Sequence, residues 1–365
     1  MSNILRTGIL QQVLNNLAGP AALPFMLEIN TELAGSANNT FVLPLYDIED
    51  ITVDWGDDTV EQFTQAADVT HVYPAPGIYT VSITGTAFQV VQFDGATDAQ
   101  KVLRAWMADL GWGSAHHTFT GCSNLTHVYT SDGNWSRNVT RFNSFVENCT
   151  SLIYLDVSDW NTENGIYFDS FIRGCTSLQS LESDNWNTSN AVDFGAFAHG
   201  CTALQYLGTS GWDTRNVTEF NSFVYECSSL QTLDVSGWNT SNVETFSGFA
   251  RGCTSLQTLD VSNWDTSNVV YFTNFARGCY SLSQLDMRNW NIENAQYLTN
   301  LATDVSIPTE IYDQILINWA AQNVHSGLDV NFGDSQYTAG GAAEAARNRL
   351  ITEFGWSISD DGSVN

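Results

Sequence analysis

The sequence predicts an α+β protein with four parts: an N-terminal helix, a small β-sandwich, a solenoid of about seven 26-residue repeats and a C-terminal α/β cap. Three observations predict this order. Cysteine and tryptophan recur at a fixed period through the middle of the chain, apolar and polar residues alternate ahead of it, and helical apolar spacing marks both ends. The expected boundaries are 1–25 for the helix, 26–95 for the sandwich, 96–118 for a linker and N-terminal cap, 119–303 for the solenoid and 304–365 for the C-terminal cap.

The first segment, residues 1–25, reads as a short amphipathic helix that stops at Gly19 and Pro20. Its apolar side chains form one stripe at helical spacing: Leu5, Ile9, Leu10, Val13, Leu14 and Leu17. A helix of this length is marginal alone, so the stripe needs a partner, either the body of the protein or another subunit. The segment lacks a cationic start followed by an unbroken apolar run, so we do not expect a secretory signal.

The second segment alternates apolar and polar residues over 51–63 and 70–83, around breaks rich in turn residues. This pattern is typical of a small β-sandwich. The segment resembles a PKD-type immunoglobulin-like domain over about residues 26–95, with Asp58 in place of that family's usual glycine. The resemblance is carried by Asp54, Gly56, Asp57, Thr59, His71, Tyr73, Gly77, Tyr79 and Val81.

The carboxylates Asp54, Asp57 and Asp58 allow two interpretations. Clustered carboxylates suit a hard cation such as Ca²⁺. Alternatively, they close a turn by Asx hydrogen bonds, which we favour because the loop has no alternating pattern of ligands. His71 is expected to be a hydrogen-bonded structural residue rather than a ligand or a base.

The repeat region is defined by seven cysteines and seven tryptophans. The cysteines lie at 122, 149, 175, 201, 227, 253 and 279, and the tryptophans at 135, 160, 186, 212, 238, 264 and 290. A fixed period of this size is typical of a solenoid, in which each unit buries its apolar face on its neighbours. The cysteine and tryptophan columns, and the phenylalanines between them, are therefore expected to be core.

Within one repeat we expect a short strand, a polar turn and a helix. Leu256, Leu259 and Val261 have the spacing of a strand, and Phe272 and Phe275, three residues apart, would share one helix face. A left-handed residue should end that helix at the glycines that precede cysteines, which are Gly121, Gly174, Gly200, Gly252 and Gly278. Glu226 occupies this position in one repeat, and we expect its turn to differ because glutamate adopts that conformation poorly.

The cysteines and histidines do not predict a metal site. No two cysteines are closer than 26 residues, whereas metal-binding cysteines cluster locally. Adjacent strands lie close enough for disulfides, but an odd number of cysteines in register argues for buried free thiols. His116, His117 and His127 gather near the first repeat, where we expect hydrogen bonding rather than metal binding.

The repeat unit, read from LDVSGWNTSNVETFSGFARGCTSL at 233–256, resembles the BspA-like leucine-rich repeat found in mycoplasma surface lipoproteins, with phenylalanine in place of that family's methionines. The match covers about residues 119–303. The resemblance implies a solenoid that serves in adhesion or partner recognition, and it carries over no catalytic residue. The first repeat has an insertion before Trp135, and the last carries Leu298, Leu301 and Val305 in place of two phenylalanines and the cysteine, so both read as capping repeats.

The last segment predicts a helix over 307–322 that opens at Pro308, a strand over 328–338, a second helix over 340–356 and a short final strand. Such a tail would cover the open edge of the last repeat.

The composition narrows the function. The formal charge is −28, from 40 acidic and 12 basic residues, and the charges are spread along the chain. Such an acidic surface repels phosphate groups, so nucleic acid and anionic lipid are poor partners. No membrane span, phosphate loop, nucleophile elbow or zinc-protease signature occurs, and we expect neither a cofactor nor enzymatic activity. Paired carboxylates on a carbohydrate-active solenoid enzyme are the weakest of the alternatives.

We expect a recognition protein whose solenoid surface binds a host glycan or protein. The candidate binding residues lie four and five residues after the cysteines: Tyr154, Gln179, Tyr206, Gln231 and Gln257. A phage virion component, such as a capsid decoration, head fibre or tail receptor-binding protein, is the leading interpretation. Residues 1–25 would dock onto other virion proteins, and a homo-oligomer is one option. The alternatives are a secreted or surface adhesin of a bacterium and an intracellular scaffold.

Overall fold

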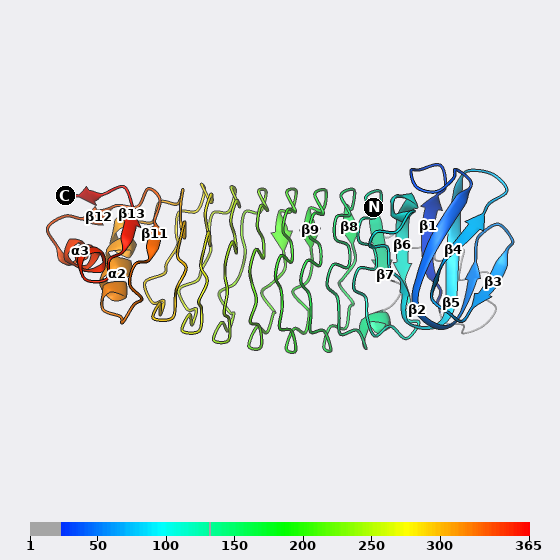
Figure 1. Ribbon diagram of the computed structural model, residues 1–365, viewed down its shortest axis with the longest axis horizontal. Coiled ribbons are helices and arrows are strands. Elements are labelled where there is room, and N and C mark those ends of the chain that lie inside the picture. The colour runs from blue at the N-terminus through cyan, green and yellow to red at the C-terminus, as the bar shows by residue number, and fades with distance from the viewer. Residues whose placement is uncertain (1–22, 131–132) are drawn as a thin grey trace.

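The computed structural model describes residues 23–130 and 133–365, which form an elongated molecule with a β-sheet domain at one end and a helical cap at the other (Figure 1). The N-terminal helix and its stripe of Leu5, Ile9, Leu10, Val13, Leu14 and Leu17 lie outside the described residues. Between the two ends the chain coils into about ten turns with a 26-residue period, more than the seven expected. We call one such turn a rung.

The N-terminal domain is a mixed sheet. Its strands are β1 (Phe25–Asn30), β2 (Thr40–Asp54), β3 (Val60–Phe63), β4 (Ala67–Val72), β5 (Ile78–Val91) and β6 (Val102–Met107). The order is β3-β2-β5-β1-β6, with β4 also paired to β2. β1 to β5 pair antiparallel, whereas β6 pairs parallel to β7 (His127–Thr130), the first strand of the solenoid. The segment 96–118, expected as a linker and cap, therefore contributes a strand that joins the domain to the solenoid.

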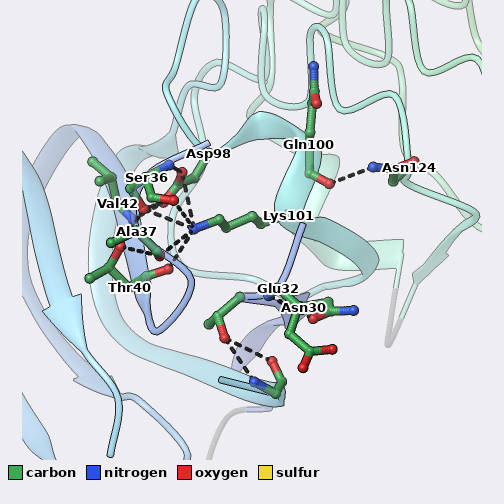
Figure 2. A network of polar contacts seen from close by, with 12 residues as sticks. Asn30, Glu32, Ser36, Ala37, Thr40, Val42, Asp98, Gln100, Lys101 and Asn124 are labelled. Atoms are coloured by element: carbon green, nitrogen blue, oxygen red, sulfur yellow. Dashed lines mark hydrogen bonds and ion pairs between the residues drawn. The ribbon is translucent and has the colours of Figure 1, made fainter. Parts of the chain in front are cut away.

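This junction contains the chain's one lysine. Lys101 is fully buried, and its Nζ donates to Ser36 Oγ and Thr40 O at 2.9 Å and to Ser36 O and Ala37 O at 3.2 Å (Figure 2). Asp98, also fully buried, lies 3.6 Å from Nζ and accepts the backbone N–H groups of Ser36 and Val42. Each buried charge thus has partners, which a buried ion pair requires to be tolerated. The network fixes the 36–42 segment of the domain to the start of the solenoid.

The strands of the rungs are very short. They are β8 (Tyr154–Leu155), β9 (Ser180–Leu181) and β10 (Tyr206–Leu207), followed by a single parallel bridge between Thr232 and Thr258. A second parallel ladder runs half a repeat away through Arg141, Tyr167, Asp193, Glu219, Thr245, Tyr271 and Tyr297. The two ladders lie on opposite sides of the apolar core.

The prediction of a helix in each repeat is wrong. Within the segment around Phe246 and Phe249, alternate N–H groups bond in two directions. The N–H groups of Phe246, Gly248 and Ala250 donate to the next rung, while those of Phe249 and Cys253 donate three residues back. Gly248 and Gly252 have φ of 66° and 76°, and a left-handed residue every four positions prevents an α-helix from continuing. The spacing of three between phenylalanines therefore reflects a chain of tight turns.

The expectation for Glu226 is also wrong. Its φ is 59°, close to the 77° of Gly200 and the 76° of Gly252, and its turn does not differ from theirs. The Glu226 N–H donates to Arg251 O at 2.7 Å, as the Gly252 N–H donates to Arg277 O at 2.8 Å. The Gly200 N–H of the preceding rung also donates to Tyr225 O, so bonds to both neighbouring rungs hold glutamate in a conformation that it adopts poorly alone. The left-handed conformation predicted for the five glycines is confirmed.

The core consists of the predicted columns. Trp212 stacks on Trp186 at 6.1 Å and 3°, and Phe194 packs on Trp212 at 4.5 Å. All seven cysteines are free and buried. Six of their thiols donate to a carbonyl of the preceding rung, as Cys201 does to Ile172 O at 2.9 Å. The cysteine column therefore supplies small buried side chains that each contribute a hydrogen bond.

Recurring threonine and asparagine side chains join neighbouring rungs by hydrogen bonds. The hydroxyl of buried Thr214 donates to Asn239 O in the following rung at 2.9 Å, and Asn216 Nδ2 donates to Ser189 O in the preceding rung at 2.7 Å. The same pair of bonds recurs along the solenoid, for example from Thr240 and Asn242. Each turn is thereby bonded in both directions, which explains why Thr and Asn recur in the repeat.

The C-terminal cap continues the stack of rungs. It comprises α2 (Thr309–Ala320), β11 (Asp329–Asn331), β12 (Tyr337–Thr338), α3 (Ala342–Thr352), β13 (Ser357–Ser359) and β14 (Ser363–Val364), which confirms the predicted helix and strand order. Ala302 N–H donates to Asn331 O, and β11 pairs parallel to β13. Trp319 of α2 donates to Met287 O at 3.3 Å, as Trp290 donates to Val261 O at 3.2 Å. The helices thus extend the tryptophan column while covering the last rung.

Candidate functional site

The predicted binding residues lie on one side of the solenoid. Gln179, Gln231 and Gln257 are exposed, the Tyr206 side chain is 40% exposed, and Tyr154 is half-buried. Tyr154 and Tyr206 belong to the first ladder, in which His127 pairs with Tyr154 and Ser180 pairs with Tyr206, and each glutamine directly precedes a ladder residue. We call this side the β-face, defined by the ladder residues Tyr154, Ser180, Tyr206, Thr232 and Thr258. Their binding role remains a prediction.

At the N-terminal end of the β-face, Tyr154 joins an aromatic cluster that the sequence interpretation missed. Tyr129 lies 5.4 Å from Trp106, 5.5 Å from His127 and 5.6 Å from Tyr154, measured between ring centroids. Burial, with a smaller effect from Arg104, lowers the pKa of His127, so this ring is neutral at pH 7. The signal that could have found the cluster is the alternation of Trp106, His127 and Tyr129 on neighbouring strands.

Further along the β-face, Tyr206 lies in a groove of about 440 Å³. The groove is lined by Asp184, Tyr206, Leu207, Thr209, Ser210, Thr232, Leu233, Asp234, Ser236, Thr258 and Asp260. Tyr206 Oη donates to Asp184 Oδ2 at 2.6 Å, and Ser210 Oγ donates to Asp184 Oδ1 at 2.6 Å. The groove therefore combines an oriented aromatic ring with carboxylates and hydroxyls.

The pKa values in the groove follow from these bonds. The hydrogen bond to Asp184, together with partial burial and nearby carboxylates, raises the pKa of Tyr206 to about 12. Burial alone would raise the pKa of Asp184, but the bonds from Ser210 and Tyr206 outweigh it and the pKa is lowered. At pH 7 the phenol is therefore neutral and the carboxylate is ionised.

The other carboxylates of the groove are a feature of the repeat. Asp234 Oδ1 accepts the N–H and the hydroxyl of Ser236, and Asp260 Oδ1 accepts the same groups of Ser262. Asp286 likewise bonds to Arg288 two residues on. These carboxylates therefore close their own turns, which accounts for an aspartate in this column without any catalytic role.

An acidic column lies on the second ladder. Asp193 and Glu219 are neighbours in register, and Asp169 lies close to Asp193. Burial and the nearby Asp193 carboxylate raise the pKa of Asp169 to about 6. Burial also raises the pKa of Asp193 and, together with neighbouring carboxylates, that of Glu219. The sequence interpretation, which treated the acidity as spread out, missed this column.

The turn considered for calcium is closed by hydrogen bonds. Asp54 Oδ1 accepts Gly56 N–H at 2.9 Å, Asp57 Oδ1 accepts Thr59 N–H at 3.2 Å, and Asp57 Oδ2 lies 2.9 Å from His71 Nε2. Asp58 is exposed with φ of 70°. The Asx hydrogen bonds expected for this turn are present, and His71 is a buried, hydrogen-bonded residue as expected.

The histidines near the first rung do not form a single cluster. The rings of His116 and His117 lie 5.4 Å apart, and His116 also bonds to Ser114, while His127 contacts the aromatic cluster of the β-face. Within residues 23–130 and 133–365, no group of three or more His, Cys, Asp or Glu could hold a metal ion. None of the helices in these ranges has the length and apolar character needed to cross a membrane.

Stacked parallel rungs with continuous side-chain columns define a β-solenoid repeat protein, preceded here by a mixed β-sheet domain. The chain belongs to the family described as Mycoplasma protein of unknown function, DUF285, whose model matches residues 114–233 and 195–314. This match confirms the mycoplasma-type, BspA-like repeat predicted from the sequence, while the PKD resemblance remains a prediction. No curated protein and no solved structure matches the chain.

Proposed function

We propose that the protein is a non-enzymatic recognition module that attaches to a glycan or protein on a cell surface through its β-face. The observation that carries this proposal is that residue identity varies on the exposed β-face but not in the core. The core columns repeat with little change. The β-face column, in contrast, contains Tyr154, Ser180, Tyr206, Thr232 and Thr258 in successive rungs. Exposed tyrosines supply large contact area at low entropic cost, and solenoids commonly bind along such surfaces.

We further propose that the module is carried by a phage virion, where residues 1–25 dock onto other virion proteins and the PKD-like domain acts as a spacer. The elongated shape, with the sheet domain at one end, suits presentation of the β-face away from a docking point (Figure 1). The alternative is display on a bacterial surface. Immunogold labelling of particles and of intact cells from the producing culture separates the two locations.

Attachment of the labelled full chain to a panel of intact bacterial cells tests the recognition role. One variant replaces Tyr154 and Tyr206 with alanine, and the matched control replaces Tyr271 and Tyr297, which lie on the second ladder with exposed fractions of 45% and 48%. We expect the first variant to lose at least tenfold in apparent affinity and the control to bind like the parent chain. Attachment to no cell, or equal attachment by both variants, would refute the proposal.

A further inference from the structure

Two neighbouring rungs of the β-face depart from the repeat in adjacent residue columns. The aspartate column runs Asp156, Glu182, Gly208, Asp234, Asp260, and the serine column runs Ser158, Asp184, Ser210, Ser236, Ser262. In the rung of Tyr206, glycine thus replaces the carboxylate, and the preceding rung carries aspartate in place of serine.

The two changes compensate each other. Asp184 takes over the missing role, since its Oδ1 accepts the Ser210 N–H at 3.3 Å and the Ser210 hydroxyl at 2.6 Å. A Cβ at position 208 would collide with the Asp184 carboxylate and would also come within 2.9 Å of the backbone N of Asp184, so glycine fits here without a shift of either group. The regular Asp and Ser pair closes a turn within one rung at Asp234 and Ser236, whereas Asp184 accepts bonds from Ser210 and Tyr206 of the following rung.

The exchange also changes the surface. It moves a carboxylate to within 2.6 Å of Tyr206 Oη, which fixes the half-exposed ring, and it leaves a glycine without a side chain beside that ring. Residues that break the local regularity of a fold are expected at functional sites. A ring held in place before binding loses less conformational entropy when a ligand arrives.

We propose that the groove around Tyr206 binds an uncharged saccharide, whose ring packs on the Tyr206 face while its hydroxyls bond to Asp184, Asp234 and Thr232. This inference rests on the proposed recognition function and names its ligand class. A sugar hydroxyl both donates and accepts, and the groove offers carboxylate acceptors together with the hydroxyls of Thr232 and Thr258. Asp234 and Asp260 use Oδ1 for their own turns, so each Oδ2 can accept a sugar hydroxyl.

Charge selects among saccharides. The groove holds three carboxylates, from Asp184, Asp234 and Asp260, and its lining residues include no arginine, lysine or histidine. The protein as a whole carries −28, so sialylated, sulfated and uronic-acid chains are repelled. An aromatic ring with a few placed polar groups is the usual composition of a small-molecule site.

The experiment is a glycan array probed with the full chain, followed by calorimetric titration with the neutral gluco-, galacto-, manno- or N-acetylglucosamine oligomers that bind. Tyr206→Ala should weaken the binding at least tenfold, and Tyr271→Ala, a tyrosine of similar exposure on the second ladder, should change it less than twofold. The decisive variant combines Asp184→Ser with Gly208→Asp, which restores the regular repeat. It should fold with a lowered melting temperature, because the new Cβ still lies within 2.9 Å of the backbone N of residue 184, and it should lose binding to the same extent as Tyr206→Ala.

The inference is overturned if none of the neutral oligomers binds. It is also overturned if only the cationic glucosamine oligomers bind, with a strong dependence on salt. A repeat-restoring variant that folds and binds like the parent would overturn it as well. Should that variant fail to fold, Tyr206→Ala and Tyr271→Ala still decide the question. The experiments distinguish failure of this inference from failure of the proposed function. If cells still bind the chain through the β-face but no neutral saccharide binds, the recognition function stands and the partner is a protein.

Discussion

Glu226 occupies a left-handed position that glycine fills in five other rungs, at 121, 174, 200, 252 and 278. A side chain in this conformation costs about 1–2 kcal/mol, and the greater freedom of glycine in the unfolded chain offsets about 0.5–1 kcal/mol of that cost. Glu226 is exposed, and glycine would keep both backbone bonds, from Glu226 N–H to Arg251 O and from Ser228 N–H to Glu226 O. Glu226→Gly should therefore raise the free energy of unfolding by about 0.5–1 kcal/mol.

Urea unfolding followed by the fluorescence of the buried tryptophan column measures this change. The matched control is Gly200→Ala, where φ is 77° and the nearest atom to the added Cβ is Gly174 Cα at 3.9 Å, so strain acts without a clash. It should lower the free energy of unfolding by about 1 kcal/mol. If Gly200→Ala destabilises as expected while Glu226→Gly does not stabilise, then glutamate gains something from its surroundings that offsets the backbone strain, and the reasoning is refuted.

Three further predictions concern buried or half-buried groups. Because the folded-state pKa of Asp169 is raised to about 6, its carboxylate lowers stability increasingly as the pH rises from about 4 to about 6. Asp169→Asn should therefore stabilise the protein at pH 7.5, and the gain should vanish near pH 3 in thermal melts; a gain independent of pH would contradict this. Burial raises the pKa of Cys201 to about 12, so the native thiols should not react with Ellman's reagent at pH 8, and all seven should react in denaturant. Rapid native labelling would argue against a sealed core. Lys101→Met leaves the Asp98 carboxylate buried without its cation and should cost about 3–5 kcal/mol in urea unfolding, whereas equal stability would show that the pair is dispensable.

The sequence alone predicted the solenoid, its period and its core columns, because identical side chains at one position of each repeat must stack on one another. It did not predict the backbone of the rungs. Phe246 and Phe249 are three residues apart in a helix and in consecutive tight turns alike, and only the bonds between rungs distinguish the two. The same bonds hold Glu226, whose conformation local preference alone argues against.

For the candidate site, the exposure of Gln179, Tyr206 and Gln231 followed from their positions after the cysteines. Asp184 was missed, although the aligned repeats contain the signal: Gly208 breaks the aspartate column and Asp184 breaks the serine column one rung earlier. Recognising the pair requires knowing that the two columns touch across rungs, and that contact is a property of the three-dimensional stack.

Because every rung bonds to its neighbours at the same offsets, the number of rungs sets the distance between the two ends of the solenoid. Deletion or duplication of 26 residues would move the sheet domain and the C-terminal cap by one strand spacing, roughly 4.8 Å, without altering either end. About ten rungs therefore set a separation of roughly 50 Å between the two ends. Deletion or duplication of a repeat away from the groove would change the distance between the two ends in fixed increments and leave the groove around Tyr206 intact.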